Sequence, residues 1–252
     1  MSTPPVLAVE RLSLQIGGAR IIDDVTLSVP EGEMLGVIGP NGAGKTTLFN
    51  LVSGVLRPTA GSIRLDGRDV TTATVDARAR AGLGRSFQTS NLFLGLSVLE
   101  NVRLAAQAAL GGAVSPFRFP RPTDAATRLA EDRLDQVGLV AHRDTLAGGL
   151  SHGDKRKLEI AMLLAADPRV ILLDEPMAGV GSGDVPGLTE LIRRVHRETG
   201  RTVLMVEHHM EVVLGLVDRV AVMHHGRLLA CDTPEIVMAD PTVQSAYLGE
   251  AV

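Results

Sequence analysis

A glycine-rich stretch near the N-terminus has the residue types and spacing of a phosphate-binding loop. A Gly is followed by four residues and then by Gly-Lys-Thr, and the nine residues concerned are Gly39, Pro40, Asn41, Gly42, Ala43, Gly44, Lys45, Thr46 and Thr47. Glycines let the backbone turn so that successive N–H groups face an anion. In this motif the Lys reaches the β- and γ-phosphates and the Thr hydroxyl reaches Mg²⁺. We therefore predict a nucleotide-phosphate site.

Two adjacent carboxylates follow a second apolar run. The run is Val170–Leu173, which is unbroken, as expected of a strand covered on both faces in a parallel sheet. Asp174 and Glu175 come directly after it, at the carboxyl end where ligands bind in open α/β sheets. Glu175 could be only a solvated carboxylate at a strand end, but its place beside Asp174 favours a chemical role.

The elements on either side of the loop are those that such a loop needs. Met34–Ile38 reads as a short buried strand, and residues 47–52 open a helix. The N-terminus of that helix would point at the anion, where N–H groups and the helix dipole favour negative charge. A glycine-rich turn that binds nothing is the alternative, and the flanking strand and helix make it the weaker one.

Strands alternate with helices in the first and last thirds of the chain, whereas the middle is mostly helical. Val6–Ile16 and Ile21–Val29 alternate like two half-buried strands. Helical patterns cover Ser97–Leu110 and Asp124–Val137, with an irregular connection between them, and a short helix is also expected at Arg78–Leu83. This order predicts an α/β nucleotide-binding core with a helical lobe inserted at roughly residues 88–165.

A helix start that resembles an anion site precedes the second apolar run. Ser151 and Asp154 have the spacing of a capping box, which predicts a helix from Ser151 through Ala165, stopped by Asp167 and Pro168. A helix N-terminus with a serine hydroxyl and exposed amides can bind an anion. For Asp154 we expect only the capping role.

Composition limits the classes of protein. The chain has 252 residues, 45% of them apolar, and a net charge of −4 with scattered basic residues, so a nucleic-acid footprint is not indicated. Lysine occurs only three times, at Lys45, Lys155 and Lys157, which makes Lys45 look selected for chemistry. The lone Cys231 fits a reducing compartment. No secretory signal is expected, and the apolar runs are far shorter than the ~20 residues of a membrane span. We expect a soluble chain.

Several motifs in a fixed order resemble those of ABC-transporter ATPase subunits. Besides the loop and the carboxylate pair, these are Gln88, the Ser151 helix start and His208, and the resemblance runs from about Val6 to Gly249. It implies an α/β P-loop NTPase fold, the ABC ATPase cassette. Such a cassette is a single domain, here 6–249, with an N-terminal antiparallel β-subdomain, a RecA-like core and an inserted helical subdomain. The nucleotide-binding core would comprise about 6–87 and 166–249, and the helical subdomain about 88–165.

The resemblance also implies roles for individual residues. The loop amides, Lys45 and Thr46 would bind the phosphates and Mg²⁺ of ATP, and Asp174 would be the carboxylate associated with Mg²⁺. Glu175 would be the general base that polarises the attacking water. Gln88 would touch Mg²⁺ and sense the membrane partner, and His208, rather than its neighbour His209, would contact the γ-phosphate.

The remaining motif implies a paired ATPase. Ser151 and Gly153 match the family's signature motif, which binds the γ-phosphate held by the other subunit. The partner would be a second copy or a related ATPase, together with transmembrane permease subunits. An extracytoplasmic solute-binding protein would belong to the complex, at the cytoplasmic face of the inner membrane, with no nucleic acid.

Three positions depart from the family pattern. Ile16 stands where an aromatic ring usually stacks on adenine, so we expect ATP to bind with weaker choice of base, since stacking on a base contributes roughly 1–3 kcal/mol. His152 and Asp154 replace the common Gly and Gln of the signature. Gly181 stands where a carboxylate is usual, which bears on communication between paired sites.

Within the family, four segments resemble the ATPases of branched-chain amino-acid importers: Leu150–Gly153 leading to Leu158–Ala161, Asp174–Gly179, Val206–Glu211 and Ala246–Gly249. This implies ATP hydrolysis that powers uptake of branched-chain or other hydrophobic amino acids. Urea or short-chain amide importers and lipid-extracting exporters have similar subunits. Soluble relatives that act on ribosomes or DNA normally carry two cassettes or long coiled coils, and this chain has neither.

Overall fold

The computed structural model describes residues 4–86, 92–111 and 124–248 and divides the chain into two compact units. The first unit comprises residues 1–85, 169–176 and 196–252, and the second comprises 86–168 and 177–195. The second unit therefore consists of one long segment, 86–168, and one short segment, 177–195. Gln88 lies outside the described residues.

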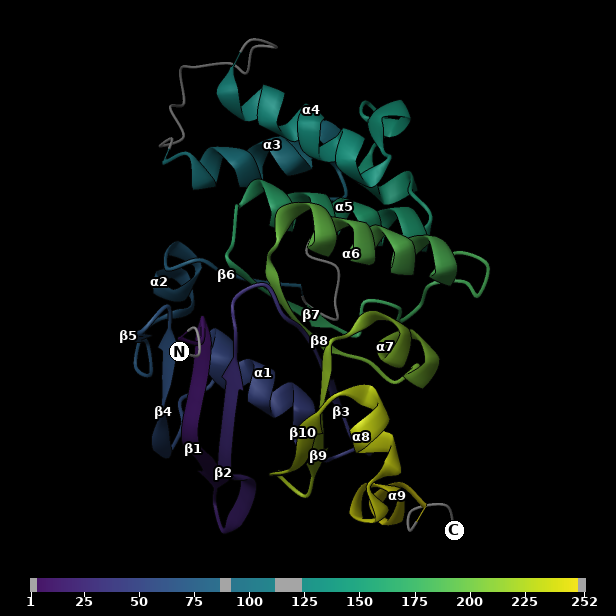
Figure 1. Cartoon of the computed structure of the whole chain (residues 1–252). Helices are drawn as coiled ribbons and strands as arrows, with labels where there is room; N and C mark the ends of the chain where they lie inside the picture. The colour runs from purple at the N-terminus through teal and green to yellow at the C-terminus, as the bar shows by residue number, and fades with distance from the viewer. Residues whose placement is uncertain (1–3, 87–91, 112–123, 249–252) are drawn as a thin grey trace. The chain divides into compact units, whose positions relative to one another are not determined.

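An antiparallel sheet forms the N-terminal part of the first unit. Its strands are β1 (Leu7–Ile16), β2 (Ala19–Val29), β4 (Ala60–Leu65) and β5 (Arg68–Asp69), in the order β2-β1-β4-β5. β1 and β2 pair as predicted, with Leu7 opposite Val29 and Ile16 opposite Ala19. Figure 1 shows β1, β2 and β4 side by side. The predicted antiparallel β-subdomain is confirmed.

A second sheet of six strands carries the predicted chemistry. Its strands are β3 (Met34–Ile38), β6 (Leu83–Arg85), β7 (Val170–Asp174), β8 (Thr202–Val206), β9 (Arg219–His224) and β10 (Arg227–Asp232), in the order β10-β9-β3-β8-β7-β6. β9, β3, β8, β7 and β6 run parallel, and β10 joins as an antiparallel edge. Every residue of β3, β7 and β8 is buried, as expected of parallel strands covered on both faces.

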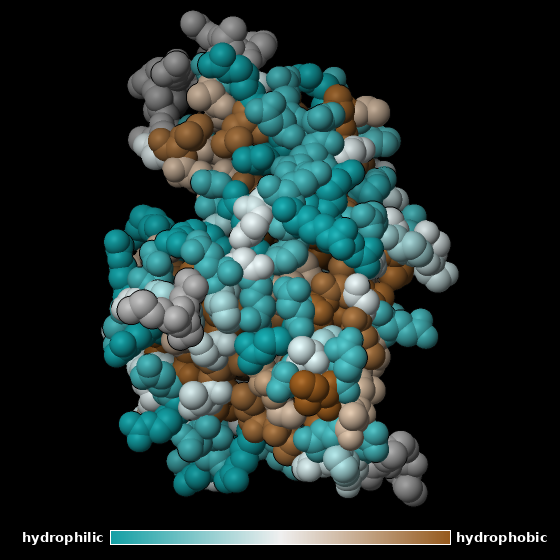
Figure 2. All heavy atoms as spheres, in the orientation of Figure 1, coloured by the Kyte–Doolittle hydropathy of each residue, from teal (hydrophilic) through white to brown (hydrophobic). Residues whose placement is uncertain are grey.

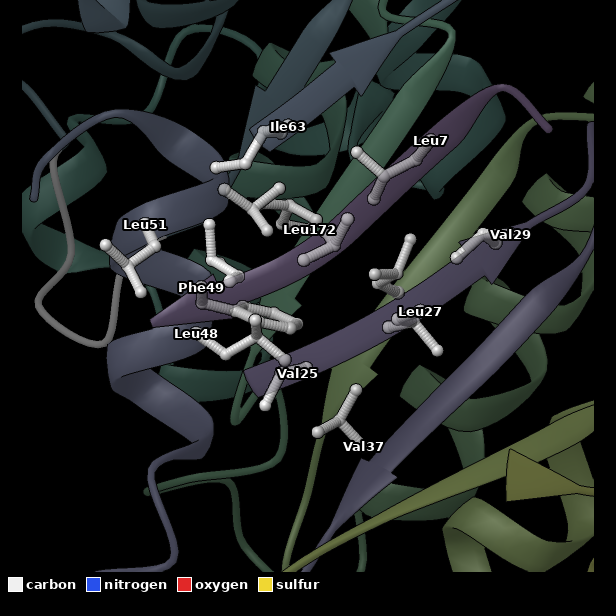
Figure 3. Close-up of a cluster of buried hydrophobic side chains, with 14 of the residues drawn as sticks. Leu7, Val25, Leu27, Val29, Val37, Leu48, Phe49, Leu51, Ile63 and Leu172 are labelled. Carbon is white, nitrogen blue, oxygen red and sulfur yellow. The ribbon is translucent and has the colours of Figure 1, made fainter. Parts of the chain in front are cut away.

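Helix α1 (Lys45–Ser53) packs its apolar side chains among those of both sheets. Leu48, Phe49 and Leu51 are at most 1% exposed and belong to one buried cluster with strand residues such as Leu7 and Leu172. Figure 3 shows these side chains converging, with Phe49 among residues of β1 and β2. Burying one Leu or Phe side chain contributes about 1.5–3 kcal/mol. This cluster fixes α1 against both sheets.

The other helices of the first unit include one that the sequence did not predict. They are α2 (Val75–Arg80), α7 (Met210–Leu216), α8 (Pro234–Ala239) and α9 (Pro241–Leu248). α7 is the unpredicted one, and a Cβ on Gly36 of β3 would lie 2.6 Å from its Val213. The helix predicted at Arg78–Leu83 is wrong in position, because Thr74 caps α2 and Leu83 already begins β6.

The second unit is built from helices. It contains α3 (Val98–Ala109), α4 (Ala125–Val137), α5 (His152–Ala165), most of α6 (Val185–Thr199) and the 3₁₀ turns η1 (Val140–His142) and η2 (Ala147–Gly149). α3, α4 and α5 pack on one another. The start of α3 is fixed by the Ser97 hydroxyl, which accepts from the Glu100 N–H, and α4 ends at Gly138 in the left-handed conformation. Both ends agree with the predicted helices.

The surface seen in Figure 2 is largely hydrophilic, with apolar side chains interspersed. Among the residues that the structure describes, no helix combines the length and the apolar character needed to cross a membrane.

Candidate functional site

The phosphate-binding loop follows β3. Its first residue, Gly39, must be a glycine for a steric reason. Gly39 has φ +148°, and a Cβ added there would lie 2.1 Å from the carbonyl oxygen of Met223 on β9. No side chain fits at that distance from a neighbouring strand's backbone. The loop is also held from the other side, because the Gly226 N–H in the β9–β10 turn donates to the Ala43 carbonyl at 3.0 Å. The two ends of the β9–β10 connection thus brace the loop.

The Lys45 ammonium lies under the loop rather than in solvent. It donates to the carbonyls of Gly39 at 2.6 Å and Pro40 at 2.9 Å, and the residue is 6% exposed. These bonds link the first turn of α1 to the start of the loop. They hold a positive charge where the loop amides also gather.

The N-terminus of α1 is left open to an anion. Its N-cap, Gly44, has φ +101° and no side-chain cap, and the first turn holds no acidic residue. α2, α3 and α5 differ, since each has a Ser or Thr cap bonded to a backbone N–H and an acid in the first turn. The first four N–H groups of a helix lack intrahelical partners, and the dipole makes that end positive. This end of α1 can therefore receive a phosphate.

Asp174 and Glu175 end β7 in different environments. The Asp174 carboxylate is buried, and its Oδ2 accepts from Arg85 Nη2 at 2.8 Å. Glu175 has φ +50°, a conformation that costs a non-glycine residue about 1 kcal/mol or more. Its N–H donates to the Val206 carbonyl of β8 at 2.9 Å, which holds the turn. Such strain is a feature of functional sites.

Glu175 and His208 meet beside the loop. His208 Nε2 lies 3.1 Å from Glu175 Oε1. The adjacent His209 turns elsewhere, with its Nδ1 3.1 Å from Glu207 Oε2, and that same oxygen accepts from the His208 N–H at 2.9 Å. Glu207 is buried and thereby fixes the turn after β8. Of the two histidines, His208 therefore faces the Glu175 carboxylate, and His209 faces that of Glu207.

A cavity of about 290 Å³ collects the loop, the carboxylate and the histidine. Its lining consists of Ile21, Asn41, Gly42, Ala43, Gly44, Lys45, Thr46, Thr47, Glu175 and His208. The predicted residue Ile16, at the end of β1, is 57% exposed and is not among them, whereas Ile21 of β2 is. The amides, the cation and the hydroxyls needed for a phosphate chain thus share one cavity with a carboxylate that can orient water.

A larger open hollow of about 1040 Å³ follows the antiparallel sheet. Arg20 and Arg227 on its wall both pair with Asp23, at 2.9 and 2.5 Å. Because these cations already have an acidic partner, the smaller cavity provides the better phosphate site.

The Ser151 helix start lies in the second unit. The Ser151 hydroxyl accepts from the Asp154 N–H at 3.1 Å, which confirms the N-cap, and donates to Asp154 Oδ2 at 3.0 Å. Lys157 donates to the other oxygen of Asp154 at 2.9 Å. Burial raises the pKa of Asp154, but the hydrogen bonds from Lys157 and Ser151 outweigh it, so its pKa lies below the ordinary value.

A carboxylate that the sequence pattern missed lies beside the signature glycine. A Cβ on Gly153 would be 3.1 Å from Asp184 Oδ2. The sequence drew attention to Gly181, where a carboxylate is usual, and Asp184 follows three residues later. Its N–H donates to the Gly181 carbonyl at 2.8 Å. The segment after β7 therefore does bring a carboxylate to Gly153.

Two further residues of the site were not found from sequence. Arg85 belongs to no motif, and the three-residue strand that it ends, Leu83–Arg85, has no pattern that would mark a buried ion pair. Ile21 begins the predicted strand Ile21–Val29, and that pattern does not mark it as a site residue. Gln88, by contrast, was predicted and falls outside the described residues.

The donor set also fits magnesium. Mg²⁺ prefers oxygen ligands and keeps several waters, so one or two protein oxygens and the substrate's phosphates suffice. Thr46 offers a hydroxyl on the cavity wall, and Asp174 a buried carboxylate on β7. Among the described residues no cluster of three or more His, Cys, Asp or Glu side chains could hold a metal.

A parallel sheet whose strand leads into a glycine-rich loop and an open helix N-terminus, beside a carboxylate, defines a P-loop nucleoside triphosphatase. Comparison with known proteins narrows this class. The family model described as "ABC transporter" matches residues 22–178, and one described as "Branched-chain amino acid ATP-binding cassette transporter" matches residues 227–252. The chain belongs to the ABC transporter ATP-binding proteins, whose members bind and hydrolyse ATP.

Several curated relatives match the whole chain. It is 38% identical to the high-affinity branched-chain amino acid transport ATP-binding protein LivG of Salmonella typhimurium and to BraF of Pseudomonas aeruginosa, in each case over 98% of this chain and 99% of the relative. It is 36% identical to the lipopolysaccharide export system ATP-binding protein LptB of Escherichia coli, over 97% of each chain.

Solved structures agree with the family. A nucleotide-free ATP-binding cassette from an ABC transporter matches with a TM-score of 0.83 and 30% identity, over 97% of this chain and 99% of the other. A cassette in its ADP conformation matches with a TM-score of 0.85 and 30% identity, over 98% of this chain and all of the other. The predicted ABC ATPase fold is confirmed. ATP-binding subunits of this family pair with one another and with permease components.

The clash at Gly39 makes a testable prediction. We expect Gly39→Ala to lower the melting temperature and abolish nucleotide binding, because the new Cβ must displace the loop from β9. Gly67→Ala is the matched control. Gly67 also has a positive φ, of +73°, but open space around a Cβ, so the change should cost about 1–2 kcal/mol and leave binding intact. Circular dichroism and titration with a fluorescent ATP analogue measure both. Normal nucleotide affinity in Gly39→Ala would contradict the role given to this loop.

Proposed function

We propose that this protein hydrolyses ATP at sites shared between two ATPase subunits, and that this hydrolysis powers uptake of branched-chain or other hydrophobic amino acids through separate permeases. The observation that carries the proposal is the cavity in which the loop, Glu175 and His208 meet. The full-length similarity to LivG and BraF supports the import reaction.

The residues of the cavity divide the chemistry among them. The loop amides and Lys45 bind the phosphate chain, with the dipole of α1 favouring its negative charge. Glu175 accepts a proton from the attacking water, and His208, whose Nε2 lies 3.1 Å from Glu175 Oε1, holds that carboxylate in place and would contact the γ-phosphate. Because phosphoryl transfer needs mainly positioning and charge stabilisation, one carboxylate and fixed donors are sufficient.

The remaining protein contacts would be those with Mg²⁺ and with the base of the nucleotide. Thr46, Asp174 and Gln88 would hold Mg²⁺, whose charge would offset the negative charge of the phosphates. Ile16 stands at the sequence position where the family has an aromatic ring, and Ile21 is the isoleucine that lines the cavity, so the phosphates rather than the base would contribute most of the affinity.

The second unit supplies the partner's half of each site. Ser151 and Gly153 sit at the N-terminus of α5, and in a dimer they would bind the γ-phosphate held by the Lys45 loop of the other subunit. The partner is a second copy or a related ATPase. Closure around ATP and reopening after hydrolysis is a hinge motion that permeases could use for alternating access.

The cargo is inferred from relatives, because the ATPase does not touch it. LivG and BraF are described as branched-chain amino acid transport proteins, and the matching C-terminal segment carries the same description. The assembly would lie at the cytoplasmic face of the inner membrane and work with an extracytoplasmic solute-binding protein. An exporter that extracts lipid is the second candidate, favoured by the 36% identity to LptB. A urea or short-chain amide importer is a further alternative for the cargo.

Removing the general base should separate binding from turnover. We expect Glu175→Gln to retain ATP binding and to lose about 10²–10⁴ in turnover, the usual contribution of a general base. Glu190→Gln, which changes a surface carboxylate paired with Arg193, is the control and should leave turnover unchanged. Phosphate release under saturating ATP measures both. Near-normal turnover in Glu175→Gln would remove this residue from its proposed role.

Mixed dimers of this chain test whether sites are shared. Two inactivating changes, Lys45→Ala and Ser151→Ala, are placed either in the same subunit or in opposite subunits, and purified by two affinity tags. If the sites are shared, the dimer with both changes in one subunit has no complete site. One site then combines the wild-type loop with the mutated serine, and the other combines the mutated loop with the wild-type serine. The opposite-subunit dimer keeps one complete site and about half the activity. The reverse pattern would mean that each subunit works alone.

The cargo is tested in the assembled transporter. The protein is copurified with its permeases, placed in lipid vesicles, and assayed with solute-binding protein. We expect leucine, isoleucine or valine to stimulate ATP hydrolysis, because a loaded binding protein favours the closed dimer. Urea, short-chain amides and lipopolysaccharide are the comparison solutes. Stimulation by lipopolysaccharide alone would support the exporter instead.

A further inference from the structure

Arg85 is a buried cation that belongs to none of the motifs used above. It ends β6, next to β7 in the parallel sheet, and its side chain is 7% exposed. One guanidinium nitrogen, Nη2, donates to Asp174 Oδ2 at 2.8 Å. The other, Nη1, donates to Asn50 Oδ1 at 2.8 Å and to Ser53 Oγ at 2.7 Å. Arg85 therefore joins the phosphate-loop helix to the carboxylate at the end of β7.

The contacts on α1 exclude a direct phosphate role for this arginine. At 1.5 Å per residue, Asn50 and Ser53 lie about 7.5 and about 12 Å along the helix from Lys45. Arg85 also packs over the Phe49 ring, with its Cζ 6.0 Å from the ring centroid, and it is not among the residues that line the 290 Å³ cavity. The guanidinium therefore lies beside the later turns of α1, away from the end that faces the phosphates.

The geometry of the fork suits a different task, the orientation of a carboxylate. A guanidinium is planar and offers several donors in fixed directions, so the two acceptors on α1 determine where Nη2 points. A charge-assisted hydrogen bond to a carboxylate is shorter and stronger than a neutral one. Asp174 is 1% exposed, so little solvent competes for its Oδ2. The position of α1 thus sets the orientation of the Asp174 carboxylate.

We propose that Arg85 is a positioning residue for the nucleotide site, which holds Asp174 in the orientation needed for the magnesium-bound nucleotide and couples that orientation to the phosphate-loop helix. The proposal rests on the proposed function, in which Asp174 serves the metal. The proposal predicts a selective effect on nucleotide affinity. Loss of the fork weakens the part of the nucleotide affinity that depends on Mg²⁺ and leaves the part from the loop amides and Lys45.

Arg78 provides a matched control within the same chain. It is also buried, at 1% exposure, and also holds the end of α1, donating to the Leu51 and Val52 carbonyls at 2.6 Å. Its other side-chain hydrogen bonds go to the Thr71 and Ala73 carbonyls. Arg78 thus stabilises the same helix, but its guanidinium donates to backbone carbonyls and not to Asp174. A purely structural effect should appear equally in variants of either arginine.

The experiment uses the full-length protein with Glu175→Gln, so that ATP is not consumed. The dissociation constant for ATP is measured by calorimetry once with excess Mg²⁺ and once with EDTA. The ratio of the EDTA value to the Mg²⁺ value gives the part of the nucleotide affinity that depends on Mg²⁺. Arg85→Lys keeps the charge but loses the fork. We expect Arg85→Lys to reduce this ratio about tenfold or more, because a hydrogen bond to a charged group contributes about that much to affinity. The dissociation constant in EDTA should stay within about threefold of the parent's value. Arg78→Lys should leave the ratio unchanged.

Two further variants keep the test decisive. Combining Arg85→Lys with Asp174→Asn should give the same ratio as Asp174→Asn alone, because the arginine acts through the aspartate. Asn50→Ala removes one anchor of the fork without changing charge, and it should reduce the ratio in the same direction even if Arg85→Lys does not fold. An unchanged ratio in both Arg85→Lys and Asn50→Ala, or equal loss with and without Mg²⁺, would overturn the proposal. If the Glu175→Gln parent shows no magnesium dependence at all, the proposed function itself fails.

Discussion

The nucleotide site depends on the direction in which one short helix points. α1 has only nine residues, and isolated helices of that length are marginal in water, so its stability must come from tertiary packing. Leu48, Phe49 and Leu51 provide that packing within the cluster shared by both sheets. Arg78 satisfies carbonyls at the far end, where a cation is favourable to the dipole. With these groups in place, the N-terminal end can remain uncapped.

Much of the fold could be predicted because its signals are local. The apolar runs at Met34–Ile38 and Val170–Leu173 mark strands covered on both faces, and the observed strands coincide with them almost residue for residue. Ser97, Gly138 and Ser151 mark helix ends through hydrogen bonds made within one turn, which a sequence pattern captures. The phosphate-binding loop could be located for the same reason, since the conformational freedom and charge that it needs are properties of its own residues.

The features that escaped prediction depend on long-range packing. The hydrogen-bond partners of Arg85 include Asn50, Ser53 and Asp174, which are far from it in the sequence. The helix α7 is short and was not predicted, and its packing against β3 requires the absence of a side chain at Gly36. Asp184 reaches Gly153 only because the chain after β7 turns back through a loop. None of these contacts leaves a periodic or motif-like trace.

The two hydrogen bonds that Lys45 makes to loop carbonyls have a consequence for the thermodynamics of association. They tie the side chain and the loop together as part of the folded chain, so the conformational entropy of ordering them is lost during folding rather than on encounter with a ligand. A ligand then meets a preformed concave surface, which is the usual character of small-molecule sites. Affinity at this loop is accordingly a difference between two sets of charge-assisted bonds. It should respond more to changes in the ligand's charge than to its flexibility.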